Sequence, residues 1–99
     1  MPLLFSWDGK KAELNLRKHG VSLEEASTVF GDDLSITIED PDHSLEEQRL
    51  ITIGESAHGR LVVVVHADRE ATIRIISARR ALGGEARKYE EADYSNQDR

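Results

Sequence analysis

The first part of the chain places apolar residues at helical spacing. A short strand is predicted over 4–7, and Asp8 is a good N-cap for a helix over about 9–19. Gly20 supplies the left-handed residue that commonly ends a helix. The apolar stripe of this helix is expected to hold Ala12 and Leu16, with Leu14 beside it.

A second helix is predicted directly after the first. Ser22-Leu23-Glu24-Glu25 has the form of a capping box, and apolar residues recur at helical spacing up to Phe30. Val21 and Ala26 are placed to pack as a hydrophobic staple, and Gly31 ends the segment. We therefore expect a strand followed by a tight pair of helices.

After Asp33 the period changes from that of a helix to that of a strand. Strands are predicted over 34–38, 49–53, 61–65 and 73–80, separated by polar or glycine-containing turns. The segment 61–65 is apolar on both faces, so it belongs at the centre of the sheet. Within the turn that follows 34–38, residues 44–47 form a second capping-box pattern and predict one helical turn.

The last element is a charged helix. Gly83 and Gly84 interrupt the pattern, residues 85–93 have helical character, and 94–99 are expected to form a flexible tail. The predicted order is β-α-α-β-β-β-β-α over one domain, 1–99. Successive strands lie close enough in sequence to pair antiparallel. We therefore predict an α+β fold: a mainly antiparallel, twisted sheet with helices packed on one face.

Composition limits the cellular compartment and the partners that can be expected for this domain. The chain has 99 residues, no cysteine and a net charge of −6. The absence of cysteine excludes disulfides and thiolate metal sites, and no apolar run approaches membrane-spanning length, so we expect a cytoplasmic protein without membrane contact. The negative charge argues mildly against direct nucleic-acid binding. Basic residues nevertheless cluster over 10–19 and 60–80, which allows a basic patch on an acidic body.

The most unusual stretch is the last predicted strand, Ile73 to Arg80. A charged head inside a sheet is costly unless it is paired or reaches water, so arginines among isoleucines suggest a strand that ends in an anion site. Regular alternation places Arg74 and Arg79 on opposite faces. Without a β-bulge they cannot serve one site, and Arg79, at the strand end, is the stronger candidate.

The remaining candidate chemistry is a scatter of histidine, glutamate, lysine and arginine. None of the four histidines has partners at zinc-type spacing, and neither a phosphate-binding loop nor a nucleophile elbow is present, so no metal and no cofactor are predicted. Such a set suits cleavage of RNA through its own 2′-hydroxyl. That reaction needs a base, an acid and cations that stabilise the crowded phosphorus centre.

Most candidates also have a simpler structural explanation. Lys18 and His19 end a helix, where its dipole favours cations. His43 lies beside acids in a turn, and Glu47 closes a capping box. An edge arginine that extends to water explains Arg49, and His66 fits a satisfied core histidine. For Arg79 alone the functional explanation comes first.

An ordered set of motifs adds a family resemblance. It runs through Phe5-Ser6-Trp7-Asp8, Lys10, Asn15, Lys18-His19-Gly20-Val21, Glu24-Glu25-Ala26, Val29-Phe30, Asp40, His43-Ser44, Glu47-Gln48-Arg49, Ile53-Gly54-Glu55-Ser56, Gly59-Arg60, Arg69, Ile73 to Arg79 and Tyr89-Glu90. This set resembles the BrnT family of bacterial toxins from type II toxin–antitoxin pairs, over nearly the whole chain.

The resemblance implies a RelE-like ribonuclease fold, translation arrest by RNA cleavage, and neutralisation by a BrnA-like antitoxin. That antitoxin carries a ribbon-helix-helix domain, so operator DNA is expected to be bound only through it. Carried over by position, the implied catalytic residues are Arg79, His19, Lys18, Arg49, Glu47 and His43, and the implied RNA- or phosphate-binding residues are Arg74, Lys10 and Arg60. The motifs do not assign acid and base among them.

Two positions depart from the family pattern. Leu23 stands where phenylalanine is frequent, which is a packing exchange, and His66 stands where tyrosine is common, which leaves the role of that strand end open. The rival interpretation is a degenerate toxin that only binds its antitoxin and acts as co-repressor. Direct DNA binding by this chain ranks below both, because no recognition helix with a basic face is visible.

Overall fold

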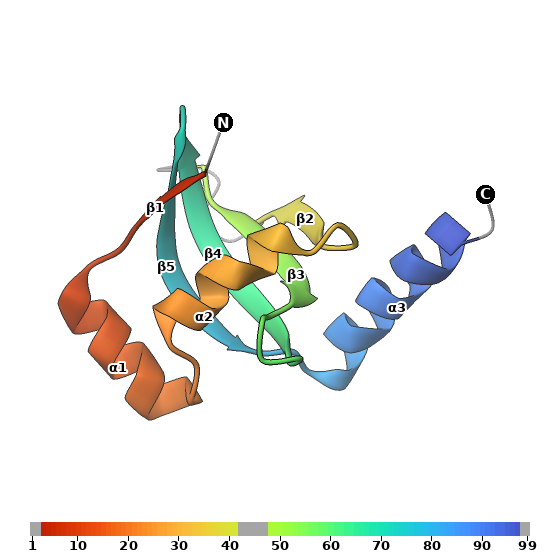
Figure 1. Cartoon of the computed structure of the whole chain (residues 1–99), viewed down its shortest axis with the longest axis horizontal. Coiled ribbons are helices and arrows are strands. Elements are labelled where there is room, and N and C mark those ends of the chain that lie inside the picture. The colour runs from red at the N-terminus through yellow and green to blue at the C-terminus, as the bar shows by residue number, and fades with distance from the viewer. Residues whose placement is uncertain (1–2, 42–47, 98–99) are drawn as a thin grey trace.

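A computed structural model of the chain describes residues 3–41 and 48–97. The elements in chain order are β1 (Leu4–Ser6), α1 (Gly9–His19), α2 (Leu23–Thr28), the 3₁₀ turn η1 (Val29–Gly31), β2 (Ile36–Glu39), β3 (Leu50–Glu55), β4 (Leu61–Arg69), β5 (Thr72–Arg80) and α3 (Gly83–Gln97) (Figure 1). This order confirms the predicted α+β class. The helical turn predicted at 44–47 lies outside the described residues.

One sheet contains all five strands, in the order β1-β5-β4-β3-β2. The apolar strand β4 is its centre, as predicted, because both of its faces must be buried. The pairs β2–β3, β3–β4 and β4–β5 are antiparallel, whereas β1 pairs in parallel with β5. The first and the last strand of the chain are therefore neighbours.

The two faces of the sheet carry different helices. On the α1/α2 face, Val62, Val64 and Ile75 pack in one core cluster with Val21 and Leu23, at the start of α2. On the opposite face, called the α3 face here, Val63 and Ile53 pack against Tyr89 of α3. The prediction that all helices pack on one face is therefore wrong for α3. Figure 1 shows α3 apart from α1 and α2.

The N-terminal caps of the first two helices are those predicted. The Asp8 carboxylate accepts from the backbone N–H of Lys10 at 3.0 Å, and the Ser22 hydroxyl accepts from that of Glu25 at 3.0 Å. Gly20 follows α1 in the left-handed conformation, with φ of 71°. These caps depend only on neighbouring residues, which is why sequence predicts them.

The predicted inward face of α1 is confirmed for Ala12, which packs against the core cluster, and is wrong for its leucines. Leu16 is 52% exposed, and the one buried residue of the helix is the polar Asn15. The amide of Asn15 donates to the carbonyls of Val21 at 2.9 Å and Ala78 at 2.8 Å, and its oxygen accepts from the Ala78 N–H at 3.0 Å. Asn15 thus substitutes for a neighbouring strand at the edge of β5, and this requirement outweighs the burial of a leucine.

Asp32 connects the second half of the fold. Its carboxylate accepts from the backbone N–H groups of Leu34 and Glu55, at 2.9 and 2.8 Å, and from the Tyr89 hydroxyl at 2.7 Å. Beside it the chain passes so close to Gly54 that a Cβ there would lie 2.8 Å from a Val29 methyl carbon. This packing fixes α3 against β3.

Several boundaries differ from those predicted. Strand β2 begins at Ile36 because Leu34 is held in the turn at Asp32, and β4 continues to Arg69. Helix α3 runs to Gln97, four residues beyond its predicted end at Asp93, so residues 94–97 do not form the predicted tail. No described helix is long and apolar enough to cross a membrane.

Candidate functional site

A β-bulge in β5 changes which face its arginines occupy. Along regular β4, Val65 pairs with Ser77 and His66 with Ile75, so Ile76 has no partner in the register. Arg79 pairs with Val63 and Arg74 with Ala67, and these two β4 residues share a face. The extra residue shifts the alternation, as bulges do. Arg74 and Arg79 therefore share the α3 face, which corrects the prediction of opposite faces.

Arg79 is held by Glu85 in the first turn of α3. Its two terminal nitrogens donate to the two oxygens of Glu85 at 2.8 and 2.6 Å, a bidentate, charge-assisted pair. These hydrogen bonds hold the pKa of the Glu85 carboxyl below its ordinary value and raise that of Arg79. Glu85 also accepts from the Leu82 N–H at 2.9 Å, so it caps α3 as well. The strongest sequence candidate is therefore a paired arginine.

A pocket of about 200 Å³ lies where α1 meets the free edge of β5. It is bordered by one side of the helix and by the bulge, with the lining residues Lys11, Leu14, Asn15, Lys18, His19, Ile76 and Ser77. The spacing of Lys11, Leu14 and Lys18 places them on one helical face. The pocket unites two predicted site residues, Lys18 and His19, with the strand that carries Arg74 and Arg79.

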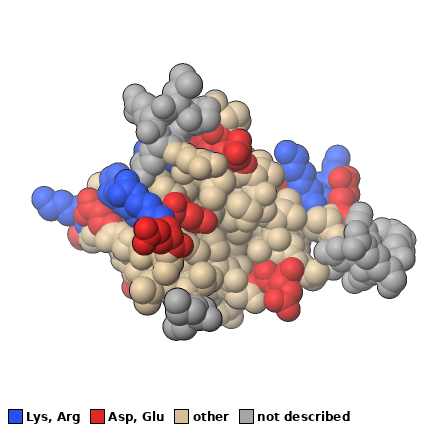
Figure 2. Space-filling view, turned by 90° about the horizontal axis from the view of Figure 1, so that it is seen from above, with Lys and Arg blue, Asp and Glu red and all other residues tan. Residues whose placement is uncertain are grey.

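Most cations near this pocket have no acidic partner. Within residues 3–41 and 48–97, Lys10, Lys11, Lys18 and Arg74 make no ion pair, whereas Arg79 is paired with Glu85. Figure 2, viewed from above, shows lysines and arginines toward two ends of the molecule, at each end beside acidic side chains, with mostly uncharged surface between them. Local positive charge thus exists on a chain whose net charge is −6.

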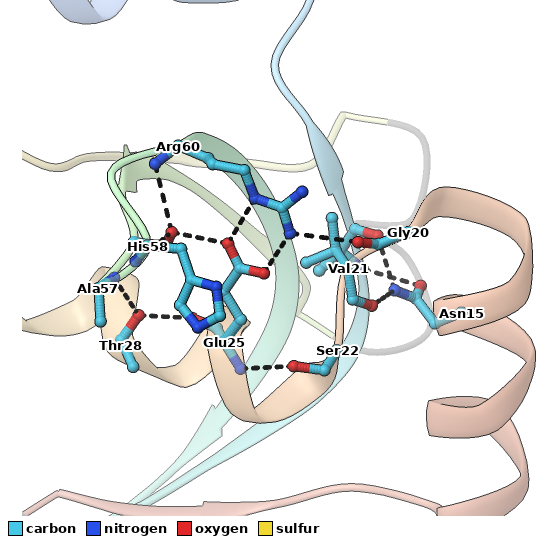
Figure 3. A network of polar contacts seen from close by, with 11 residues as sticks. Asn15, Gly20, Val21, Ser22, Glu25, Thr28, Ala57, His58 and Arg60 are labelled. Carbon is cyan, nitrogen blue, oxygen red and sulfur yellow. Dashed lines mark hydrogen bonds and ion pairs between the residues drawn. The ribbon is translucent and has the colours of Figure 1, made fainter.

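Arg60, predicted to bind phosphate, is engaged elsewhere. Its guanidinium forms a bidentate pair with the buried Glu25, donating from Nε at 2.9 Å and from a terminal nitrogen, and it also donates to the Gly20 carbonyl at 3.1 Å (Figure 3). Glu25 further accepts from the Ser56 hydroxyl at 2.7 Å. Arg60 therefore ties the β3–β4 turn to α2 and has no free donor fork for RNA. Glu25 serves this pair instead of completing the capping box.

Among the described residues, Arg49 was also predicted to be catalytic, and it does not line the pocket. Arg49 is half-buried immediately before β3, where its carbonyl accepts from the Asp40 N–H at 2.9 Å. His43 and Glu47 lie outside the described residues.

His66 forms hydrogen bonds through both ring nitrogens, with the Thr52 hydroxyl at 2.7 Å and with the Asp68 carboxylate at 2.6 Å. This hydroxyl–imidazole–carboxylate arrangement resembles a catalytic triad. Thr52 and His66 are each 1% exposed, so no substrate reaches them, and His66 is a core histidine.

Sequence reasoning missed the partners around this site. Glu85 was visible as an acid six residues after Arg79, in the first turn of a helix where acids are favoured. Ile76 and Leu14 gave no signal, because neither a bulge nor an outward-facing leucine can be inferred from apolar periodicity. No cluster that could hold a metal ion occurs among the described residues.

The Glu25–Arg60 pair predicts a pH dependence of stability. Hydrogen bonds from Arg60 lower the pKa of the Glu25 carboxyl below its ordinary value of 4.5. As the pH falls, the Glu25 carboxylate therefore binds a proton in the unfolded chain before it does so in the folded chain. The contribution of the pair to stability is complete above about pH 4.5 and is lost as the pH falls through the lower folded-state pKa. We expect Glu25→Gln, which cannot titrate, to lose less stability than wild type between pH 6 and pH 3 in urea unfolding. Equal losses would contradict the assignment.

Comparison with known proteins now identifies the family. The model of the ribonuclease toxin BrnT of type II toxin–antitoxin systems matches residues 7–85. The chain belongs to the BrnT family. The matched range includes the α1–β5 pocket, Arg79 and Glu85, so these features lie within the family domain. The confirmed assignment is to ribonuclease toxins of type II systems, which act with an antitoxin partner.

A solved structure agrees with this assignment at the level of fold. The 1.1 Å crystal structure of the Brucella abortus ribonuclease toxin BrnT aligns with a TM-score of 0.59 and 21% sequence identity, covering 82% of this chain and 99% of that one. At this identity the likeness shows the fold alone. Among curated proteins, no match to this chain was found.

Proposed function

We propose that this BrnT-family chain is a metal-independent endoribonuclease that arrests translation and is neutralised by a BrnA-like antitoxin. The observation that carries the proposal is the pocket between α1 and β5. It brings His19 and an unpaired Lys18 to the edge of β5, and the bulge of that strand places Arg74 and Arg79 together on its α3 face. Family membership supplies the substrate class, and the pocket supplies groups suited to the chemistry.

The reaction assigned to these groups needs no external nucleophile. The RNA 2′-oxygen attacks the adjacent phosphorus, its proton passes to a base, and the bond to the 5′-oxygen breaks as an acid protonates that oxygen. The products are a 2′,3′-cyclic phosphate and a 5′-hydroxyl. His19 supplies the imidazole that lines the pocket, and imidazole is the side chain that enzymes use most often as a general acid or base.

The cations have the complementary role. Lys18 in the pocket, and Arg74 and Arg79 reaching past the edge of β5 from its α3 face, stabilise the negative charge that gathers on the phosphate oxygens in the transition state, with Lys10 on the approach. His43 or Glu47 is proposed as the second proton-transfer group, and Arg49 as a further phosphate contact, on the family resemblance. Operator DNA is contacted only by the antitoxin, and the protein acts in the cytoplasm.

Cleavage in the presence of a chelator tests this proposal. Purified, antitoxin-free protein is incubated with total RNA in EDTA, beside His19→Gln and the matched control His58→Gln, whose exposed histidine lies in the β3–β4 turn outside the pocket. We expect wild type and the control to cleave, leaving 2′,3′-cyclic ends. His19→Gln is expected to be slower by about 10²–10⁴-fold.

Two observations favour a second function. Arg79 is occupied by Glu85, and the chain is acidic overall, as would suit a module that binds a basic antitoxin without cleaving RNA. A folded wild-type protein that binds its antitoxin but leaves RNA intact would decide for this co-repressor and against the nuclease.

A further inference from the structure

The α1–β5 pocket combines apolar and cationic surface in a way that catalysis alone does not require. Leu14 is 61% exposed at its border, and the bulge brings the half-buried Ile76 to the same pocket. Single exposed leucines are common on protein surfaces and mean little by themselves. Here the leucine lies between two unpaired lysines and lines the same pocket as a second apolar side chain, so the arrangement calls for a ligand with both apolar and anionic parts.

The geometry of α1 spaces these groups along the pocket. Lys11 and Lys18 are separated by two helical turns, roughly 10 Å along the axis, with Leu14 between them on the same face. An apolar surface is thus flanked by two ammonium groups. The Ser77 hydroxyl, which both donates and accepts hydrogen bonds, lies on the strand side of the pocket.

A nucleotide has the matching chemistry. Its base offers a flat apolar face with polar edges, and the phosphates on either side are anionic. Proteins hold single-stranded RNA by stacking unpaired bases on side chains and binding the backbone with cations. The pocket volume of about 200 Å³ is below the ~300–1,000 Å³ of sites for drug-sized ligands, so it suits one base.

We propose that the α1–β5 pocket is a subsite that holds one base of the RNA beside the cleaved phosphate. Leu14 and Ile76 contact the face of the base, Lys11 binds the phosphate on its far side, and Ser77 contacts its polar edge. The inference rests on the proposed ribonuclease function and adds a source of base preference. Lys18 and His19, at the other end of the pocket, remain with the reacting phosphate.

Two leucines of α1 provide a matched test. Leu14 borders the pocket and Leu16 does not, yet both are more than half exposed on the same helix. Leu14→Asp and Leu16→Asp therefore change charge and helix propensity alike, and only the first introduces a carboxylate into the proposed subsite. Thermal unfolding of both variants checks that they fold.

Binding is measured first, without cleavage. The four nucleoside 5′-monophosphates and ribose 5-phosphate are titrated into ¹⁵N-labelled protein and followed by amide chemical shifts. We expect at least one nucleotide to bind more tightly than ribose 5-phosphate and to shift amides of α1 and β5. Leu14→Asp should weaken binding of that nucleotide by roughly 5-fold or more, the lower end of the range for losing a base stacked on an aromatic side chain, while Leu16→Asp should leave it unchanged.

The outcomes separate this inference from the proposed function. Equal binding of ribose 5-phosphate and every nucleotide, or equal effects of the two leucine variants, would overturn the base subsite even if the protein cleaves RNA. Base-dependent binding that Leu14→Asp alone abolishes would support it even in a protein without nuclease activity. In an active enzyme, sequencing of cleaved ends should show a relaxed base preference for Leu14→Asp only.

Discussion

Replacing Arg79 by alanine is expected to lower the rate of RNA cleavage by about 10²–10³-fold, the usual effect of removing one donor to a developing oxyanion. The matched control is Arg80→Ala. Arg80 is the next residue of β5, is exposed, and pairs with Val62 on the α1/α2 face, so its removal takes the same charge from the opposite side of the sheet. Single-turnover cleavage of a defined RNA measures both variants.

The pairing of Arg79 with Glu85 sharpens this experiment. If the guanidinium must leave Glu85 to reach a phosphate, Glu85→Gln should bind RNA more tightly than wild type, because the competing carboxylate charge is gone. If Glu85 instead holds Arg79 in the productive position, the same variant should cleave more slowly. Full activity of a folded Arg79→Ala protein would remove Arg79 from the site under either alternative.

Replacing Asn15 by alanine is expected to lower the free energy of unfolding by about 2–4 kcal/mol. The change leaves the buried N–H and C=O of Ala78 and the C=O of Val21 without their side-chain partner, and unsatisfied buried polar groups are costly. Urea unfolding followed by circular dichroism measures the loss. The control Leu16→Ala removes an exposed side chain from the same helix and should change stability by less than about 0.5 kcal/mol.

Asn15→Asp tests the individual bonds. An aspartate of the same shape can still accept from the Ala78 N–H but cannot donate to the two carbonyls, so its carboxylate would face them without hydrogen bonds. We therefore expect it to be at least as destabilising as alanine at neutral pH. A fully stable Asn15→Asp protein would show that the two donated bonds contribute nothing.

The features that could be predicted from the sequence are those that depend on residues close together in the chain. Asp8, Gly20 and Ser22 satisfy the ends of their own helices, and the apolar character of β4 on both faces requires a central position. These features follow from local hydrogen bonding and burial, which any fold containing the segments must satisfy. The α+β class and the element order were predicted for the same reason.

The predictions that failed concern contacts between residues far apart in the chain. Asn15 occupies the inward face of α1 because Ala78, 63 residues later, presents an unpaired strand edge. Glu25 leaves its capping box because Arg60 offers a stronger, charged partner, and Arg60 is in turn held in this pair. The bulge at Ile76 exists only relative to β4. A single chain without aligned relatives carries no sign of such pairings.

The parallel pairing of β1 with β5 also governs when this protein can assemble during its own synthesis. A nascent chain that has emerged from the ribosome only as far as β4 offers β1 no neighbour in the sheet and offers Asn15 no backbone to hold. Contacts between distant segments are the slow ones to form, and synthesis proceeds from the N-terminus. The pocket between α1 and β5 is therefore absent from every translation product that stops before β5, and prematurely terminated chains should be harmless to the cell that makes them.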